Sequence, residues 1–199
     1  MVHPKKRIGG LALLWPEGVD VSLQSYTTHH VDAKVMFDRR KFRVTCMYGW
    51  SEGHMKKYTW ELLDHLVNGN TLPWVVFGDF NGVLFPFKKE GGNGFDFQVA
   101  YDFMALLDRK DLHDTGYNWY RFTWSNGRKY KEHIKEGLDR FLCSDEWSLL
   151  WPTSRVTNII WEGSDNYPIL LDTEPASRQA EKRDHVVKFE VVWTKEHTF

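Results

Sequence analysis

The sequence predicts a layered α/β fold, and three consecutive stretches carry the prediction. The stretches 42–48 and 72–77 are rich in apolar and β-branched residues and are followed by Gly49 and Gly78, so each predicts a buried strand. Between them, apolar residues recur at helical spacing over 51–67. One helix between two buried strands is a crossover unit, and such units build layered α/β folds.

Asp79 and Asn81 follow directly on the second of these strands. In open α/β sheets, the carboxyl ends of the strands form the rim where ligands bind. If the strand continues, both side chains point to one side and offer a carboxylate for a hard cation and an amide for a phosphate oxygen or a water. A tight turn is the alternative interpretation, because Gly, Asp and Asn favour turns for backbone reasons alone.

The composition is that of one ordinary globular domain, with 199 residues, 42% of them hydrophobic and 27% charged. A net charge of −1 gives no global basic field, which counts against a sequence-independent coat for nucleic acid. The same charge is compatible with a metal-dependent phosphodiesterase, in which the cation handles the phosphate charge.

Cellular location is constrained by the two cysteines and by the N-terminus. Cys46 and Cys143 form neither a disulfide framework nor a zinc-ligand spacing, so we expect an intracellular, nuclear or cytoplasmic protein. The basic run Lys5-Lys6-Arg7 is a weak nuclear address. The apolar stretch 11–15 is too short for a signal peptide or a membrane span, so we expect no membrane partner.

The first half of the chain predicts mostly antiparallel strands. The run 9–15 predicts a buried strand ended by Pro16, and alternation over 19–25 predicts a half-exposed strand. A further strand over 31–37 turns at 39–41 into the strand 42–48. The following helix has a predicted apolar stripe of Tyr58, Leu62, Leu63, Leu66 and Val67.

The second half predicts one helix over 97–108, with Phe103, Leu106, Leu107 and either Ala100 or Tyr101 facing inward. A Gly-rich charged loop, 85–95, precedes it. The later predicted elements are a hairpin of 122–125 and 134–142 around Asn126-Gly127, a short helix 145–150 capped by Ser144, and strands 156–161 and 169–171. The composition then changes, so we predict a basic tail 1–8, a domain 9–174 and a charged linker or tail 175–199.

Several motifs follow one another in an order that resembles a known family. They are Gly9-Gly-Leu-Ala-Leu-Leu-Trp15, Tyr48-Gly49, Leu72-Pro-Trp-Val-Val-Phe-Gly-Asp-Phe-Asn81, Lys89-Glu-Gly-Gly92, Phe122-Thr-Trp-Ser-Asn126, Ile134-Lys-Glu-Gly-Leu-Asp-Arg140, Glu146-Trp147 and Ser164-Asp-Asn-Tyr-Pro-Ile-Leu-Leu171. Together they are similar to the endonuclease/exonuclease/phosphatase (DNase I-like) family, and most of all to the endonuclease domain of plant LINE-type (non-LTR) retrotransposons. The tail Lys188-Phe-Glu-Val-Val-Trp193 resembles the segment that leads to the reverse transcriptase in such elements.

The resemblance implies a four-layer α/β sandwich that hydrolyses phosphodiester bonds of DNA with Mg²⁺. It places the family's Asp and Asn of the Gly-Asp-x-Asn motif at Asp79 and Asn81, and its active-site Tyr at Tyr48. It places the Asp that orients the catalytic His at Asp139, and the Asp beside that His at Asp165. It implies Asp79 and Asp165 as ligands of the metal.

Three departures from the family pattern concern the catalytic group. Asn166 stands where the family has its catalytic His, and an amide cannot carry a proton at neutral pH. Only eight residues precede Gly9, so we expect the first strands of the fold, with their catalytic Asn and metal-binding Glu, to be missing; Glu17 and Glu52 are misplaced to substitute. Gly137 stands where related elements carry Arg. We therefore expect a degenerate active site.

Other polar residues are candidates for binding nucleic acid. Lys89, Arg128 and Lys129 are expected to contact a phosphate backbone and Trp124 to stack on bases, although solvated loop charge, Lys88 included, and a core tryptophan are the alternatives. The histidines lack metal-ligand spacing, and His133 is expected to sit at the wrong depth to replace the missing base. Our leading hypothesis is a degenerate domain that binds nucleic acid or protein, and its rival is a residual Mg²⁺-dependent endonuclease.

Overall fold

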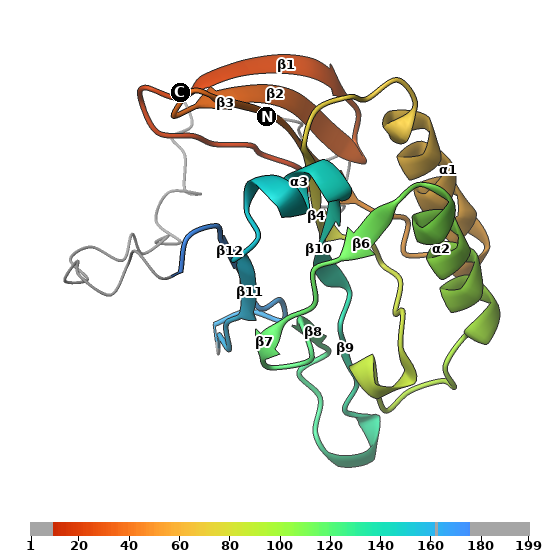
Figure 1. The fold of residues 1–199 in the computed structure, drawn as a ribbon. Coiled ribbons are helices and arrows are strands. Elements are labelled where there is room, and N and C mark those ends of the chain that lie inside the picture. Colours follow the sequence, from red (N-terminus) through yellow and green to blue (C-terminus); the bar gives the residue numbers. More distant parts are fainter. Residues whose placement is uncertain (1–9, 162, 176–199) are drawn as a thin grey trace, which may run out of the picture.

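The computed structural model describes residues 10–161 and 163–175, and it confirms the α/β class. Its central element is a six-stranded sheet with the order β1-β2-β3-β4-β10-β6 (Figure 1). The strands are β1 Asp20–Tyr26, β2 His30–Phe37, β3 Arg40–Tyr48, β4 Trp74–Asp79, β6 Leu112–Asp114 and β10 Asp139–Ser144. Within this described sheet, only β3 and β4 pair in parallel, because the helix α1, Lys56–Val67, crosses over between them as the sequence predicted.

Helices and smaller sheets cover the two faces of this sheet. The helices α1 and α2, Phe97–Arg109, lie side by side over one face (Figure 1) and share an apolar core with Met47, Val76 and Leu142. A second apolar core on the other face joins Val75, Phe141 and Val156 with Trp147 of the helix α3, Asp145–Leu150, and with Trp151 at its C-cap. Alternation along each strand explains the two cores, since neighbouring residues point to opposite faces.

Two three-stranded sheets complete the described structure. One has the order β12-β11-β7 and the other the order β5-β9-β8. Their strands are β5 Lys89–Glu90, β7 Asn118–Trp119, β8 Trp124–Ser125, β9 Lys135–Glu136, β11 Arg155–Asn158 and β12 Ile169–Asp172. Short 3-10 turns are η1 Gly53–Met55, η2 Pro86–Lys88 and η3 Tyr130–Glu132.

The strand predicted over 9–15 is wrong for the residues described. Residues 10–15 form no named strand, and Leu14 and Trp15 are 81% and 51% exposed. A strand needs a neighbour that accepts its backbone hydrogen bonds, and β1 pairs only with β2 in the described sheet. An apolar run alone does not supply that neighbour.

The strand predicted over 134–142 is two strands in different sheets. Lys135 and Glu136 pair with β8 in the predicted hairpin, whereas β10 starts at Asp139 and enters the large sheet. The break falls at Gly137, where a Cβ atom would come within 2.8 Å of the carbonyl oxygen of Arg121. A side chain at this position would therefore require the backbone around Arg121 to shift.

Three smaller expectations are also corrected, and the alternative left open for α2 is resolved. The buried side chains of α1 are Thr59, Trp60, Leu63 and Leu66, whereas Tyr58 is 39% exposed. In α2, Ala100 faces inward and Tyr101 is exposed. The strand predicted over 156–161 ends at Asn158, and the last strand is a partly exposed edge rather than a buried strand.

Both predicted tails lie outside the described residues, apart from Pro175, so the domain boundaries stay predictions. Ser144 caps α3 as predicted, because its hydroxyl accepts a hydrogen bond from the Trp147 amide. Among the described helices, none combines the length and the apolar character that crossing a bilayer requires.

A buried ion pair ties the strands β2, β3 and β4 to the end of α1. The guanidinium of Arg43 donates two hydrogen bonds to the carboxylate of Asp32, at 2.8 and 3.1 Å, and a third to the Leu66 carbonyl. Thr45 donates to the same carboxylate, and the Trp74 indole donates to Thr45. Every member is bonded, which is the condition under which a buried charge is tolerated.

The substitution Asp32→Ala is expected to lower the free energy of unfolding by about 3 kcal/mol, because it leaves the Arg43 guanidinium buried without its partner. Urea unfolding measures the change. Asp20→Ala, at an exposed position on β1, is the control and should stay within about 0.5 kcal/mol of wild type. A loss below about 1 kcal/mol for Asp32→Ala would show that the pair does not hold these strands together.

Candidate active site at the strand ends

Three polar side chains meet where β3, β4 and β10 are in register. Tyr48 is the partner of Asp79 in the parallel pair, and Asp139 is the partner of Asp79 in the antiparallel pair. All three have the strand parity of residues in the second core, such as Phe77 and Phe141, so they lie on that face of the sheet. Sequence reasoning named each of them, and the strand register brings them to one level.

Asn81 lies in a turn and not on a continuing strand. β4 ends at Asp79, and Asn81 has a φ of 50°, in the left-handed region. Its backbone N–H donates to the Asp79 carboxylate at 2.7 Å, and its side-chain amide donates to the Gly49 carbonyl at 2.8 Å. The tight-turn interpretation is therefore right for the backbone, and the turn still fixes Asn81 beside Asp79 and the end of β3.

The two facing carboxyl groups are electrostatically unfavourable when both are ionised. Burial, followed by the charge of Asp79, raises the pKa of Asp139 to about 7. Burial also raises the pKa of Asp79, although the Asn81 N–H and the charges of Arg140 and Lys56 oppose the shift. Asp139 Oδ2 is buried and has no hydrogen-bond partner among the described residues. This site therefore favours a shared proton or a bound cation.

Arg140 is a buried cation that the sequence analysis did not single out. Its guanidinium donates to the carbonyl oxygens of Gly82 and Gly137 and lies 3.4 Å from Asp114. It packs near the rings of Phe80 and Phe103, which places it on the helix side of the sheet, opposite Asp139. The sequence signal that could have identified Arg140 was a charged residue near the start of an otherwise apolar strand.

Lys88 is also buried, which corrects its expected position in a solvated loop. Only 6% of its surface is exposed. Its ammonium lies 3.7 Å from the Asp114 carboxylate and 4.7 Å from the centre of the Tyr117 ring. Its aliphatic stem passes over Gly137, where a Cβ atom would come within 3.2 Å of it. Glycine at that position thus leaves room for the lysine.

The loop with Asp165 and Asn166 is anchored close to Asp139 through the segment 123–125. Thr123 accepts a hydrogen bond from the Asp139 amide with its hydroxyl, and one from the Tyr167 amide with its carbonyl. The Asp165 carbonyl accepts from the Ser125 amide. The side chains of Asp165 and Asn166 are exposed and bond to each other at 3.2 Å. Among the described residues, no hydrogen bond joins these two side chains to Asp79 or Asp139.

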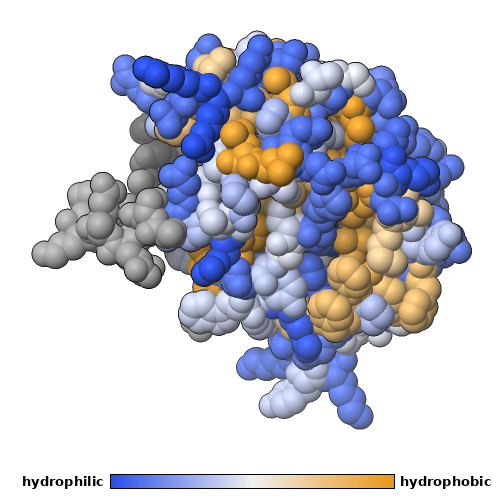
Figure 2. Space-filling model, viewed as in Figure 1, coloured by the Kyte–Doolittle hydropathy of each residue, from blue (hydrophilic) through white to orange (hydrophobic). Residues whose placement is uncertain are grey.

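The proposed nucleic-acid contacts lie on and beside the hairpin of β8 and β9. Lys89 pairs with Glu136, and the exposed Arg128 lies 3.6 Å from Glu132. Lys129 is exposed at the hairpin tip, which forms a hydrophilic projection in Figure 2. Trp124 is half-buried. Of the four, Arg128 and Lys129 therefore present the most accessible charges.

His133 is held on the same hairpin. Its Nε2 atom lies 2.9 Å from the Ser125 hydroxyl, so the imidazole is tied to the base of the hairpin tip. No contact of His133 with Asp139 is present among the described hydrogen bonds.

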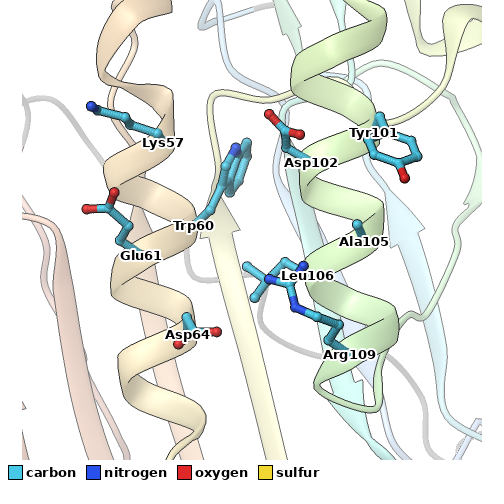
Figure 3. A pocket seen from close by; sticks show the side chains of 9 residues that line it. All are labelled: Lys57, Trp60, Glu61, Asp64, Tyr101, Asp102, Ala105, Leu106 and Arg109. Atoms are coloured by element: carbon cyan, nitrogen blue, oxygen red, sulfur yellow. The ribbon is translucent and has the colours of Figure 1, made fainter.

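Neither of two cavities in the described structure is lined by Asp79 or Asp139. A cavity of about 510 Å³ lies between α1 and α2, where Trp60 and Asp102 face one another and Tyr101 points away (Figure 3). A second, of about 480 Å³, is lined by Ser125, Asn126, Trp161, Asp165 and Tyr167. Only the second includes a predicted site residue, Asp165. Within the described ranges, no group of three or more His, Cys, Asp or Glu side chains is arranged to hold a metal.

The fold is similar to that of several solved structures. The endonuclease domain of TRAS1, a telomere-specific non-LTR retrotransposon, matches with a TM-score of 0.65 and 15% identity over 80% of this chain and 70% of that one. A beta toxin from Staphylococcus aureus matches with a TM-score of 0.52 and 18% identity over 72% of this chain and 56% of that one, which is less than two thirds of the toxin chain. An endonuclease/exonuclease/phosphatase family protein from Leptotrichia buccalis matches at 0.46, with 14% identity over 78% and 61% of the chains.

The chain has a DNase I-like fold. This confirms the fold class that the motifs implied. No protein-family model matches the sequence, and a search of curated proteins found no similar one. At identities this low, the DNase I-like match establishes the fold, and the activity has to be argued from the residues.

Asp139→Asn is expected to stabilise the protein in a pH-dependent way. Because the pKa of Asp139 is higher in the folded protein than in the unfolded chain, the stability of wild type falls as the pH rises from about 4 towards 7. Asparagine has no charge to gain, so the variant should match wild type near pH 4 and exceed it by about 1–3 kcal/mol above pH 7. Urea unfolding across this range measures the difference, with exposed Asp102→Asn as control. An equal stability of both proteins at pH 8 would contradict the buried carboxyl pair.

Proposed function

We propose that this chain is a nucleic-acid-binding domain of DNase I-like fold whose hydrolytic centre is degenerate. The motifs shared with plant LINE-type retrotransposons support an origin in such an element, and the TRAS1 match supports the same fold. The nucleic acid we propose is DNA. A protein partner and a nuclear or cytoplasmic location stay predictions from the sequence.

One observation carries the proposed loss of catalysis: among the residues that the structure describes, no imidazole is bonded to Asp139. In the resemblance, this carboxylate orients the catalytic His. Here its Oδ2 atom is buried and has no hydrogen-bond partner in the described ranges, and the exposed Asn166 bonds to Asp165. An amide can donate to a phosphate oxygen, but it cannot take a proton from water. Loss of a positioned acid–base group reduces a rate by roughly 10²–10⁴.

The carboxylate pair fits a divalent cation by the chemistry of its donors. Asp79 and the unpartnered oxygen of Asp139 are hard ligands of the kind Mg²⁺ prefers, and Asp165 is a further ligand that the sequence proposes. When bound, the cation would neutralise the two carboxylates and polarise a phosphate oxygen. Asp79 and Asp139 would hold it, with Asn81 fixed beside them by its turn.

The remaining groups of the site suit binding of a phosphodiester. The Tyr48 hydroxyl is a donor on the strand next to Asp79, and burial raises its pKa, so it keeps its proton at neutral pH. The Asn81 amide is committed to the Gly49 carbonyl, which holds the turn rather than the substrate. Tyr48 is therefore the donor toward a backbone phosphate, Asn81 holds the turn beside it, and neither residue supplies a proton carrier.

A residual Mg²⁺-dependent endonuclease is the second candidate, because the facing pair Asp79 and Asp139 is retained. A carboxyl group with a pKa of about 7 can itself exchange a proton near neutral pH. The two candidates therefore differ in turnover and agree on binding.

Two assays separate the two candidates. One measures nicking of a supercoiled plasmid in Mg²⁺, and the other measures binding of a fluorescent DNA duplex in EDTA. We expect wild type to bind the duplex and to nick the plasmid no faster than Asp79→Ala, because the proton carrier is missing. Asn166→His should raise nicking if the imidazole reaches Asp139, and Asn166→Gln is the matched control that changes the side chain without adding a proton carrier.

Metal-dependent nicking by wild type that Asp79→Ala abolishes would reject the degenerate centre in favour of the residual endonuclease. Absence of duplex binding at low salt would reject the nucleic-acid role itself.

A further inference from the structure

Three aromatic side chains form a continuous strip that starts beside Tyr48. The rings of His29 and Trp50 are stacked with centres 3.6 Å apart, and the rings of Trp50 and Tyr58 are 5.9 Å apart. His29 is also nearly parallel to Tyr48, at 6.4 Å. We call His29, Trp50 and Tyr58 the aromatic strip. It joins the turn between β1 and β2, the end of β3 and the first turn of α1.

The imidazole of His29 is fixed in one orientation. Its Nδ1 atom lies 2.7 Å from the Tyr48 carbonyl oxygen, and since a carbonyl only accepts, Nδ1 carries the proton. The Tyr48 amide donates to the His29 carbonyl, and the His29 amide donates to the Thr27 hydroxyl. Nε2 has no protein partner among the described hydrogen bonds. A half-buried, oriented ring thus offers its second nitrogen to a ligand.

Two lysines accompany the strip at the start of α1. The exposed Lys57 has its ammonium 5.1 Å from the centre of the Tyr58 ring. Lys56 lies near enough to Asp79 for its charge to lower the pKa of that carboxyl. Glu52 is the acidic neighbour, and its charge raises the pKa of Tyr48. Aromatic rings interleaved with cations are the arrangement that binds a single nucleic-acid strand.

The strip is continuous with the proposed phosphate site. His29 adjoins the end of β3, and Asp79 ends the next strand, so His29 lies about 10 Å from Asp79, which is two strand spacings. A backbone phosphate held at Asp79 and Tyr48 would therefore place the flanking nucleotides over these rings. Binding of a second copy of the chain or of a membrane surface would not require the aromatic strip to adjoin the two carboxylates.

We infer that the aromatic strip and Lys57 are the track along which a nucleic-acid strand leaves the carboxylate site. His29 and Tyr58 contact the sugar and base faces, and Lys57 contacts a phosphate. This inference rests on the proposed binding of nucleic acid and adds the place where the strand lies.

Equilibrium binding of a fluorescent single-stranded oligonucleotide in EDTA tests the track. Lys57→Gln should weaken binding at low salt and reduce the slope of log affinity against log salt by about 0.7. His29→Leu should weaken binding roughly tenfold with the slope unchanged. Lys34→Gln is the control, because Lys34 is an exposed lysine of β2 paired with Arg43, at the end of the sheet away from Asp79.

Thermal melts of each variant establish that it is folded, and the exposed Lys57→Gln carries the test if His29→Leu melts early. Wild-type affinity in both Lys57→Gln and His29→Leu would overturn the track and leave the proposed function standing. The rings would then serve only to pack the turn on α1. Equal losses in Lys34→Gln would also overturn it. No binding by wild type would overturn both the track and the proposed function.

Discussion

The register between β3, β4 and β10 is the constraint on which the site depends. It sets Tyr48, Asp79 and Asp139 side by side on one face of the sheet, directly above the apolar layer of Phe77 and Phe141. A shift by one residue would turn all three towards the helices. Because the carboxyl groups face each other over an apolar layer, both have raised pKa values.

The sheet keeps positive charge close to this pair without placing it in direct contact. Arg140 follows Asp139 in the chain and so points to the helix side, where Asp114 and two carbonyl oxygens hold it. Lys88 shares Asp114 with it. The cations therefore stabilise the region through the sheet, and the face with Asp79 and Asp139 stays open to a cation or a proton.

Much of this arrangement could be predicted from the sequence. The apolar run before Asp79 predicted a strand end, and the helix between two apolar runs predicted the parallel pair. Pairing partners are not encoded locally, so the run 9–15 was assigned a strand that the structure does not form. Burial of Lys88 depends on Asp114 and on the missing side chain at Gly137, which only the folded chain brings together. The role of His29 likewise depends on Trp50 and Tyr48, which are distant in sequence.

In the proposed function, the site holds a phosphodiester without cutting it. Acceptors for a cation, a phenol donor and an aromatic strip are present at the rim, whereas the position opposite Asp139 holds no imidazole among the described residues. The most direct measurement is a pH titration of the Asp139 carboxyl carbon by NMR in selectively labelled protein without metal. The account predicts a titration of the Asp79–Asp139 pair with one midpoint at about pH 7. A midpoint for Asp139 below about 4 would show that a cationic partner already sits beside it, and would contradict the account.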